Sequence, residues 1–317
     1  MYVTPMDHFK LTTLFLLFLA VIRPASAQEL TSSDRAAMTA GEERIAAHVR
    51  RIYTDSSEAA RFAATRDLIR ELVSTLDRPH SFDYTFGNVP GLAVAYAPDS
   101  TFRIFTWELN VDREQYRHYG AIQRNATELD LIPLVDRGDE WLGNPENEIN
   151  GADSWLGYAV YDIVAGDTYR GKPYYFVLGY DSYSLYRRRK VLDVLHFDEA
   201  GKPVFGLPVF LTYTDAGLLL PDRARIILEY AAEATVAMRP DPELGGILYE
   251  NLIMMPGNNE EGPVQVPDGS YHLLQMDEQG RWLEKEQVFT HKYDEAPREV
   301  PKPSEGRDIF GRGGGGR

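Results

Sequence analysis

Aromatic residues gather in the segment 155–186, and they are the first candidates for ligand chemistry. Its rings are Trp155, Tyr158, Tyr161, Tyr169, Tyr174, Tyr175, Tyr180, Tyr183 and Tyr186. A tyrosine offers an apolar face for stacking and a hydroxyl for hydrogen bonding, so rings along a sheet can bind a glycan or a peptide. We predict ligand binding at Trp155, Tyr158, Tyr174, Tyr180 and Asp181. The alternative, favoured by rings that alternate onto both strand faces, is that they fill a core.

Histidines and carboxylates offer a second kind of chemistry. His80 lies in the run Arg78–Asp83 and His196 in the run Asp193–Asp198, so each has an aspartate nearby in sequence. Such groups bind metals or exchange protons when the fold brings them together. No metal-ligand spacing supports a shared site, which favours two structural histidines instead.

A secreted hydrolase is the enzymatic alternative to a binding protein. Its chemistry would lie near Asp181, Asp193 and His196, and a carboxylate pair could join Glu108 to Asp181 or to Glu250. Nothing in the sequence places these groups together, so we assign no catalytic residue. The chain also lacks the G-x-S-x-G, H-E-x-x-H, P-loop and EF-hand motifs.

Oxygen-bearing side chains accumulate in the segment 136–153. They are Asp136, Asp139, Glu140, Asn144, Glu146, Asn147, Glu148, Asn150 and Asp153. Their spacing matches no calcium loop, so a solvated surface loop is the preferred interpretation. The chain contains no cysteine, which excludes thiolate metal sites, iron–sulfur clusters and cysteine nucleophiles. We predict neither a metal site nor a cofactor.

The charge balance argues against nucleic acid as a partner. The 33 lysines and arginines face 48 acidic residues, for a formal net charge of −15. A chain this acidic lacks the diffuse basic field that binds phosphate backbones or anionic lipid. The basic run Arg187–Lys190 could bind an anion, but such runs more often protect a sheet edge from pairing.

The first residues of the chain have the pattern of a secretory signal peptide. Lys10 precedes the apolar run Leu11–Ile22, and Ala25-Ser26-Ala27 follows it. The run is too short to span a bilayer comfortably, and a small-residue end is typical of a cleavage site. We predict cleavage before Gln28, no transmembrane segment in the mature chain, and a secreted or periplasmic location.

Two helices are expected in the segment 34–78. Ile45, Val49 and Ile52 have the spacing of one helix face, and Asp55 with Glu58 is a plausible start for the second helix. Its predicted apolar face comprises Phe62, Ile69, Val73 and Leu76. The short polar link between the helices predicts an antiparallel pair.

Strands are expected from about residue 84 onward. Phe105, Trp107 and Leu109 alternate with polar residues, as in a half-buried strand. The segments 155–164 and 174–180 are apolar on both faces, which predicts central strands. The segment 224–238 mixes helical composition with alternation, and we favour a strand.

Hairpins should connect these strands. The segments 198–202 and 277–281 share the pattern D-E-x-G-basic, which suits a hairpin loop with glycine at positive φ. The sequence shows no alternating strand–helix–strand pattern, so a parallel α/β fold is disfavoured. The predicted fold is therefore mainly β: an antiparallel meander (barrel, sandwich or propeller-like) with an N-terminal αα-hairpin.

This organisation divides the chain into four parts. We expect a signal peptide at 1–27, a helical hairpin at 28–83, an antiparallel β domain at 84–290 and a Gly/Pro/charged tail at 291–317. The oligomeric state is open.

Three stretches carry a resemblance to a known group of proteins. They are Phe102–Trp107 followed by Tyr119–Gln123, Lys172–Tyr175 followed by Leu178–Asp181, and Lys190–Leu195 followed by Gly201–Gly206. Together they resemble a family of exported bacterial proteins of unknown function, over roughly residues 40–290. The resemblance implies a β-rich domain after a helical hairpin and implies no catalytic residue. We expect a non-enzymatic binding or envelope-associated module, with a glycan or peptide as ligand and the hydrolase as the alternative.

Overall fold

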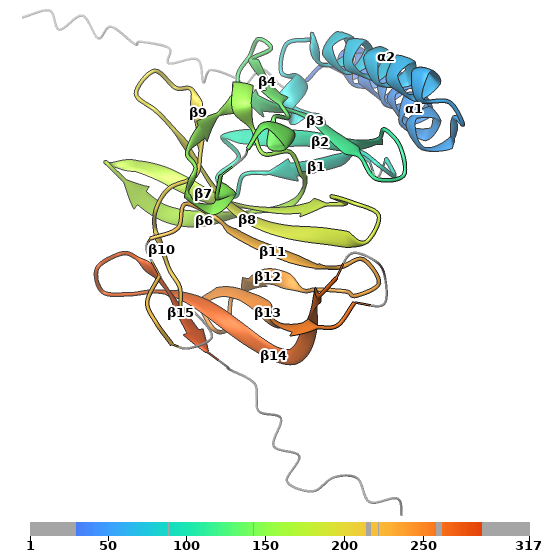
Figure 1. Ribbon diagram of the computed structural model, residues 1–317. Helices are drawn as coiled ribbons and strands as arrows, with labels where there is room; N and C mark the ends of the chain where they lie inside the picture. Colours follow the sequence, from blue (N-terminus) through green and yellow to red (C-terminus); the bar gives the residue numbers. More distant parts are fainter. Residues whose placement is uncertain are drawn as a thin grey trace, which may run out of the picture.

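The structure is a computed structural model, and it describes residues 30–286 apart from 88, 142, 214–216, 221 and 258–261. A helical pair and three sheets are stacked in four layers (Figure 1). The two helices, α1 (Ser32–Thr54) and α2 (Glu58–Leu76), lie side by side at one end of this stack. The predicted signal peptide 1–27 and tail 291–317 lie outside the described residues.

The sheet next to the helices is a four-stranded antiparallel meander. Its strands in order are β1 (Ala93–Tyr96), β2 (Phe102–Asn110), β3 (Tyr116–Arg124) and β4 (Leu131–Val135). The middle sheet has the order β5-β9-β8-β7-β6, and β11 pairs with β8. Those strands are β5 (Asn150–Gly151), β6 (Ala159–Tyr169), β7 (Lys172–Asp181), β8 (Arg187–Phe197), β9 (Pro203–Phe205) and β11 (Ile226–Ala231).

The outermost sheet has the order β10-β15-β14-β13-β12. Its strands are β10 (Phe210–Leu211), β12 (Met238–Asp241), β13 (Gly246–Met255), β14 (Val264–Met276) and β15 (Trp282–Glu286). β10 runs parallel to β15, and the other pairs in this sheet are antiparallel. The predicted mainly β fold with antiparallel sheets is confirmed. The described strands form open sheets and close no barrel, and none of the described helices is long and apolar enough to cross a membrane.

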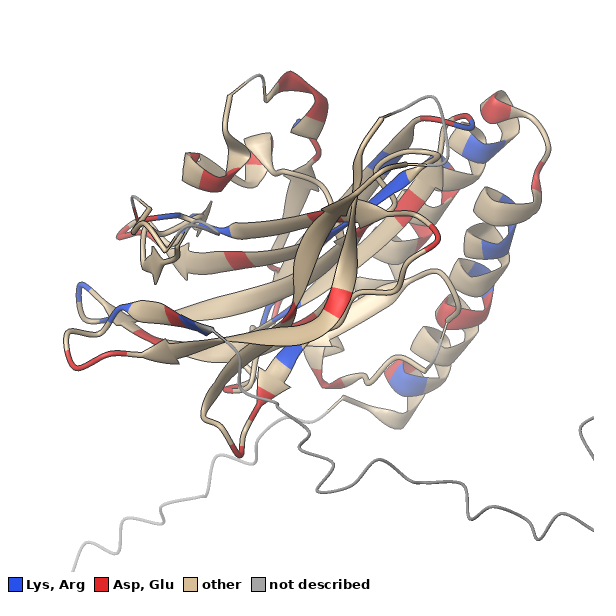
Figure 2. Cartoon of the chain, turned by 60° about the horizontal axis from the view of Figure 1, so that its bottom comes forward, with Lys and Arg blue, Asp and Glu red and all other residues tan. Residues whose placement is uncertain are grey.

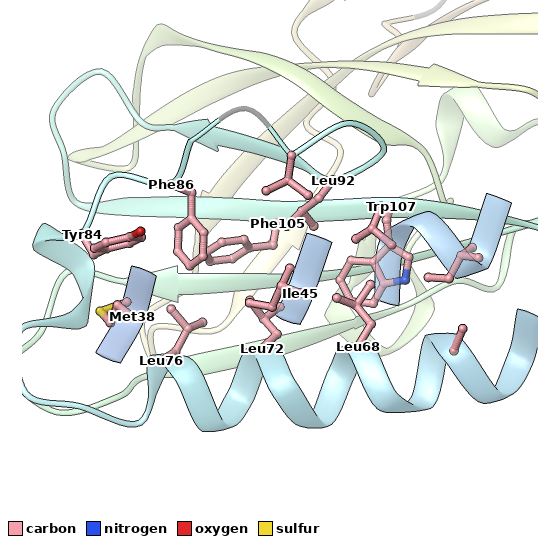
Figure 3. Close-up of a cluster of buried hydrophobic side chains, with 14 of the residues drawn as sticks. Met38, Ile45, Leu68, Leu72, Leu76, Tyr84, Phe86, Leu92, Phe105 and Trp107 are labelled. Atoms are coloured by element: carbon pink, nitrogen blue, oxygen red, sulfur yellow. The ribbon is translucent and has the colours of Figure 1, made fainter. Parts of the chain in front are cut away.

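Three apolar clusters fill the spaces between the layers. The first joins the helices to β2 and includes Ile45, Leu72 and Trp107, as Figure 3 shows. The second lies between the first and middle sheets, and the third lies between the middle and outermost sheets. Because side chains of a strand point alternately to its two faces, β7 sends Val177 into the second cluster and Phe176 into the third. The expected burial on both faces is confirmed for 174–179, whereas Tyr180 is partly exposed.

The helical pair follows its predicted pattern in α1 and departs from it in α2. Ile45, Val49 and Ile52 are buried, as expected. In α2 the buried stripe is instead made by Ala64, Thr65, Leu68, Leu72, Thr75 and Leu76, whereas Ile69 and Val73 are exposed. The predicted face of α2 was therefore wrong at Ile69 and Val73, whereas Leu76 is buried and Phe62 packs partly buried against the first cluster. Small residues at 64, 65 and 75 let α2 pack closely, and this closeness selects the face.

Two strand predictions also need correction. β2 is buried on both faces, since Phe105 packs towards the helices while Ile104 packs towards the middle sheet. Even Thr106, on a face predicted to be polar and exposed, is buried and accepts the N–H of Val160 at 2.9 Å. The segment 155–164 is not a central strand: β6 begins at Ala159 and lies at the edge of its sheet. For 224–238, the favoured strand is present as β11, which ends at Ala231.

The repeated turn pattern has the expected geometry. Gly201 and Gly280 both have φ of +77°, which an L-residue adopts only at a cost. In each turn the first aspartate donates its N–H to the carbonyl of the basic residue four positions along: Asp198 to Lys202 at 2.9 Å and Asp277 to Arg281 at 2.7 Å. These closures make the β8–β9 and β14–β15 connections tight hairpins.

Candidate functional site

A histidine surrounded by carboxylates lies where the first and middle sheets meet. His118 in β3 faces Glu108 in β2, and the two residues are direct cross-strand partners. Its Nε2 lies 3.1 Å from Glu108 Oε2 and 3.8 Å from Oδ1 of Asp181, the last residue of β7. Asp136, which follows β4, approaches the other ring nitrogen, with Oδ2 at 3.7 Å from Nδ1. We call these four residues the His118 cluster.

Backbone and hydroxyl donors hold each carboxylate of the His118 cluster in place. Asp136 accepts the N–H of His118 at 2.8 Å and that of Gly138 at 3.0 Å. Glu108 accepts the Ser182 hydroxyl at 2.8 Å and its N–H at 3.2 Å. Asp181 accepts the N–H of Tyr183 at 2.8 Å. The strands β2, β3 and β7 thus meet through a fixed polar network.

The network shifts the pKa values of its members. Burial would lower the pKa of His118, but hydrogen bonds to Asp136 and Glu108 and the charges of Asp181 and Glu108 raise it to about 10. The ring is therefore an imidazolium at neutral pH. Burial would raise the pKa of Glu108, yet hydrogen bonds from His118 and Ser182 lower it overall. For Asp181 burial dominates and raises the pKa, because its bonds to donors are fewer.

A cavity of about 770 Å³ opens beside this network. His118, Asp136 and Asp181 form part of its wall, and part-exposed rings also line it: Tyr116, Trp141 and Tyr183. Arg189 contributes to the same wall, with its guanidinium carbon 3.3 Å from the centre of the Tyr183 ring. The cavity therefore combines aromatic faces with charged planar groups.

The segment 136–153, predicted to be a solvated loop, forms one side of this cavity. It contains the 3-10 turns Gly138–Glu140, Pro145–Asn147 and Ala152–Ser154, the last followed by the buried Trp155. Arg225 holds the segment by donating to the Glu148 carbonyl at 2.8 Å and to Asn150 Oδ1 at 2.9 Å. Asp136 is mostly buried, so the expectation of a purely solvated loop fails at that residue.

The five predicted ligand-binding residues do not form one site. Trp155, Tyr158 and Tyr174 belong to the cores and present almost no surface to solvent. Tyr180 is partly exposed, and Asp181 lines the cavity. Of the predicted residues only Asp181 lies at the cavity, and ligand binding through the five stays a prediction.

The residues of the hydrolase alternative are also divided. Asp193 is fully buried, paired with Arg225 at 3.1 Å and bonded to the Tyr158 hydroxyl at 3.0 Å. His196 lies opposite Tyr174 in the β7–β8 register. Tyr174 and Asp181 are seven residues apart on β7, so His196 is separated from Asp181 by roughly 23 Å along the strand direction. His80 lies at the start of the turn Ser81–Asp83, and no described interaction joins it to His196. The structure does bring Glu108 together with Asp181, but Glu250 lies in β13 of another sheet.

Sequence reasoning missed His118, Tyr116 and Trp141, and it named Asp136 and Tyr183 only as members of an acidic segment and an aromatic-rich segment. Nothing local in the sequence marks His118, because its link to Glu108 depends on the register of β2 and β3. No local pattern marks Asp136 among its acidic neighbours. Figure 2 shows acidic and basic residues interspersed along the two helices, whereas several loops carry mainly acidic residues.

No protein-family model, curated protein or solved structure matches the chain significantly. The function is therefore inferred from the geometry of the site.

Proposed function

We propose that this protein is an exported, non-enzymatic binding module that holds a short glycan in the cavity beside the His118 cluster. One observation carries the proposal: exposed aromatic rings and fixed carboxylates face the same cavity. A sugar ring stacks its C–H face on an aromatic side chain, and its hydroxyls bond to planar charged groups. Tyr183 is exposed to 39%, and Arg189 covers one face of its ring, so the opposite face is the one offered to the sugar next to Asp181, which supplies the oxygens.

The size and polarity of the cavity support a polar ligand. A volume of about 770 Å³ fits within the range of small-molecule sites. Its wall also carries the exposed polar side chains Glu114, Gln115 and Asp139, and an apolar ligand would remove their hydrogen bonds to water without replacing them. A short oligosaccharide satisfies them through its hydroxyls.

Export is supported by the start of the chain. The apolar run Leu11–Ile22 with Ala25-Ser26-Ala27 after it has the order of a secretory signal. The test is to express the full chain, including its first residues, in a bacterium and to determine the N-terminus of the product. In the secreted or periplasmic fraction the chain should begin at Gln28. An intact N-terminus in the cytoplasm contradicts export.

Thermal-shift screening against oligosaccharides and short peptides tests the ligand, with calorimetry on each hit. A glycan should raise the melting temperature, since a ligand that binds only the folded chain stabilises it. Tyr183→Ala should abolish this shift. Tyr169→Ala is the matched control, because Tyr169 is exposed to 36% in β6 and is not among the residues that line the cavity. Equal effects of the two variants, no glycan response, or a response to peptides alone would overturn the proposal.

A hydrolase is the second candidate, favoured by one observation. A carboxylate oxygen of Glu108 and one of Asp181 lie within 4.8 Å of each other. Paired carboxylates at about 5 Å flank the scissile bond in retaining glycosidases. Incubation with each glycan hit, followed by analysis for new reducing ends, separates the two functions: binding without product supports the module, and product lost in Glu108→Gln supports the hydrolase.

A further inference from the structure

The donor atoms of the His118 cluster converge on one point from three different strands. Glu108, His118 and Asp181 each offer one ligand atom, and these atoms all lie within 4.8 Å of one another. The imidazole donor is Nε2, which faces both carboxylates. A cation among the three atoms would touch all of them after small side-chain rotations.

The charges of this cluster are unbalanced. Glu108, Asp136 and Asp181 are three carboxylates with side-chain exposures of 15%, 14% and 12%. Within the described part of the chain, His118 is the sole basic side chain with a nitrogen inside ion-pair distance of any of them. Even a charged imidazole leaves two negative charges that are poorly solvated, and such an excess is costly without a further cation.

The residues around the three donors match the support that metal ligands require. The other ring nitrogen of a metal-bound histidine usually faces a carboxylate, a backbone carbonyl or a water, which fixes the ring orientation. Asp136 has that place, with Oδ2 3.7 Å from Nδ1 and a bond to the backbone N–H of the same residue. Ser182 holds Glu108 in the same way through two bonds. These contacts fix the ring and the carboxylate independently of any ligand.

We propose that Glu108, His118 and Asp181 form a binding site for one divalent first-row metal cation, with Asp136 as the positioning residue. One imidazole and two carboxylates suit Zn²⁺ or Mn²⁺, whereas Mg²⁺ and Ca²⁺ favour sets made only of oxygens. Binding exchanges the proton on Nε2 for the cation and releases it to solvent. His118 and Asp181 line the cavity, so remaining coordination positions face it and take water. The site needs no glycan, so it goes beyond the proposed function.

Calorimetric titration of the EDTA-treated full chain with ZnCl₂ and with MnCl₂ tests the site. Wild type should bind one cation per chain. Asp181→Asn and Glu108→Gln, which keep the side-chain shapes, should weaken binding by at least about tenfold. The control is His272→Gln, because His272 and Glu284 form a second histidine–carboxylate pair, 3.4 Å apart, in another sheet. This variant should bind as wild type does.

A measurement on wild type keeps the test independent of how the variants fold. Substoichiometric Mn²⁺ should broaden the ring resonances of His118 before those of His196 and His272. Absence of binding by either metal overturns the site, as does broadening at another histidine first. The site is also overturned if metal binding survives in a folded Asp181→Asn variant but is lost in His272→Gln. Glycan assays do not enter this test, so failure of the metal site and failure of glycan binding are separate results.

Discussion

Glu108 and His118 lie directly opposite each other on β2 and β3, with 3.1 Å between Oε2 and Nε2. A slip of one residue in this register would turn His118 to the face that packs against the helices. The cross-strand pair Ile104 and Ile122, both fully buried, fixes the same register from the other end of the hairpin. Ordinary apolar packing thus determines the geometry of the polar site.

Trp155 and Tyr183 should respond in opposite ways to truncation. Trp155 is fully buried, so Trp155→Ala should lower the free energy of unfolding by about 3–5 kcal/mol. Tyr183→Ala removes a ring exposed to 39% and should cost less than about 1 kcal/mol. Urea denaturation of both variants measures the difference. Similar losses would show that Tyr183 is a core residue rather than part of an accessible wall.

The buried pair Asp193 and Arg225 should be essential for stability. Both side chains are inaccessible, with 3.1 Å between Oδ1 and Nε. Asp193→Asn leaves the guanidinium buried with reduced compensation and should cost about 3–5 kcal/mol. The control is Glu140→Gln, which breaks an exposed pair with Arg137 and should cost no more than about 1 kcal/mol. Equal costs in urea denaturation would contradict a special role for burial.

The local parts of the fold were predictable from sequence because they depend on near neighbours. The D-E-x-G-basic turns at 198–202 and 277–281 require only a glycine that accepts positive φ. The apolar spacing of Ile45, Val49 and Ile52 identifies the buried face of α1. Where several faces are covered, as in β2, alternation misleads, since the layer above and the layer below both bury side chains.

The site was largely beyond sequence reasoning because it joins distant segments. Glu108 with Asp181 was one of two carboxylate pairs that the residue types allowed, and the sequence offered no means of choosing between them. The choice depends on how the end of β7 lies against β2. Ser182, which follows β7, joins the two strands by donating two hydrogen bonds to Glu108. The aromatic-rich segment was visible, but core and surface rings have the same residue types. Only burial separates Tyr158 from Tyr183.

Glu229 should make the stability of the middle sheet depend on pH. Burial would raise the pKa of its carboxyl, but hydrogen bonds from Arg187 and Arg189 outweigh burial and lower it. A lowered folded-state pKa contributes stability that is complete above the unfolded-state pKa of about 4.3. That contribution is lost as the pH falls through the folded-state value.

Comparison of wild type with Glu229→Gln isolates this contribution. The difference in their free energies of unfolding should be present at neutral pH and shrink in acid below about pH 4. Urea denaturation at a series of pH values measures it, with Glu199→Gln in an exposed turn as the control. A difference that stays constant with pH would mean that Glu229 acts through shape rather than through its charge.

Gly41 and Thr75 should be coupled where the two helices cross. Gly41 is buried in α1, and a β-carbon built on it would overlap the Thr75 side chain of α2. Alanine normally stabilises a helix interior relative to glycine by about 1 kcal/mol. Here Gly41→Ala should instead destabilise the protein by about 1–3 kcal/mol, because a β-branched side chain has no room to move away. Thr75→Ala removes the overlapping atoms, so the double variant should lose less stability than the sum of the single variants. Additive losses in urea denaturation, or a stabilised Gly41→Ala variant, would show that the helices do not pack as closely as this pair requires.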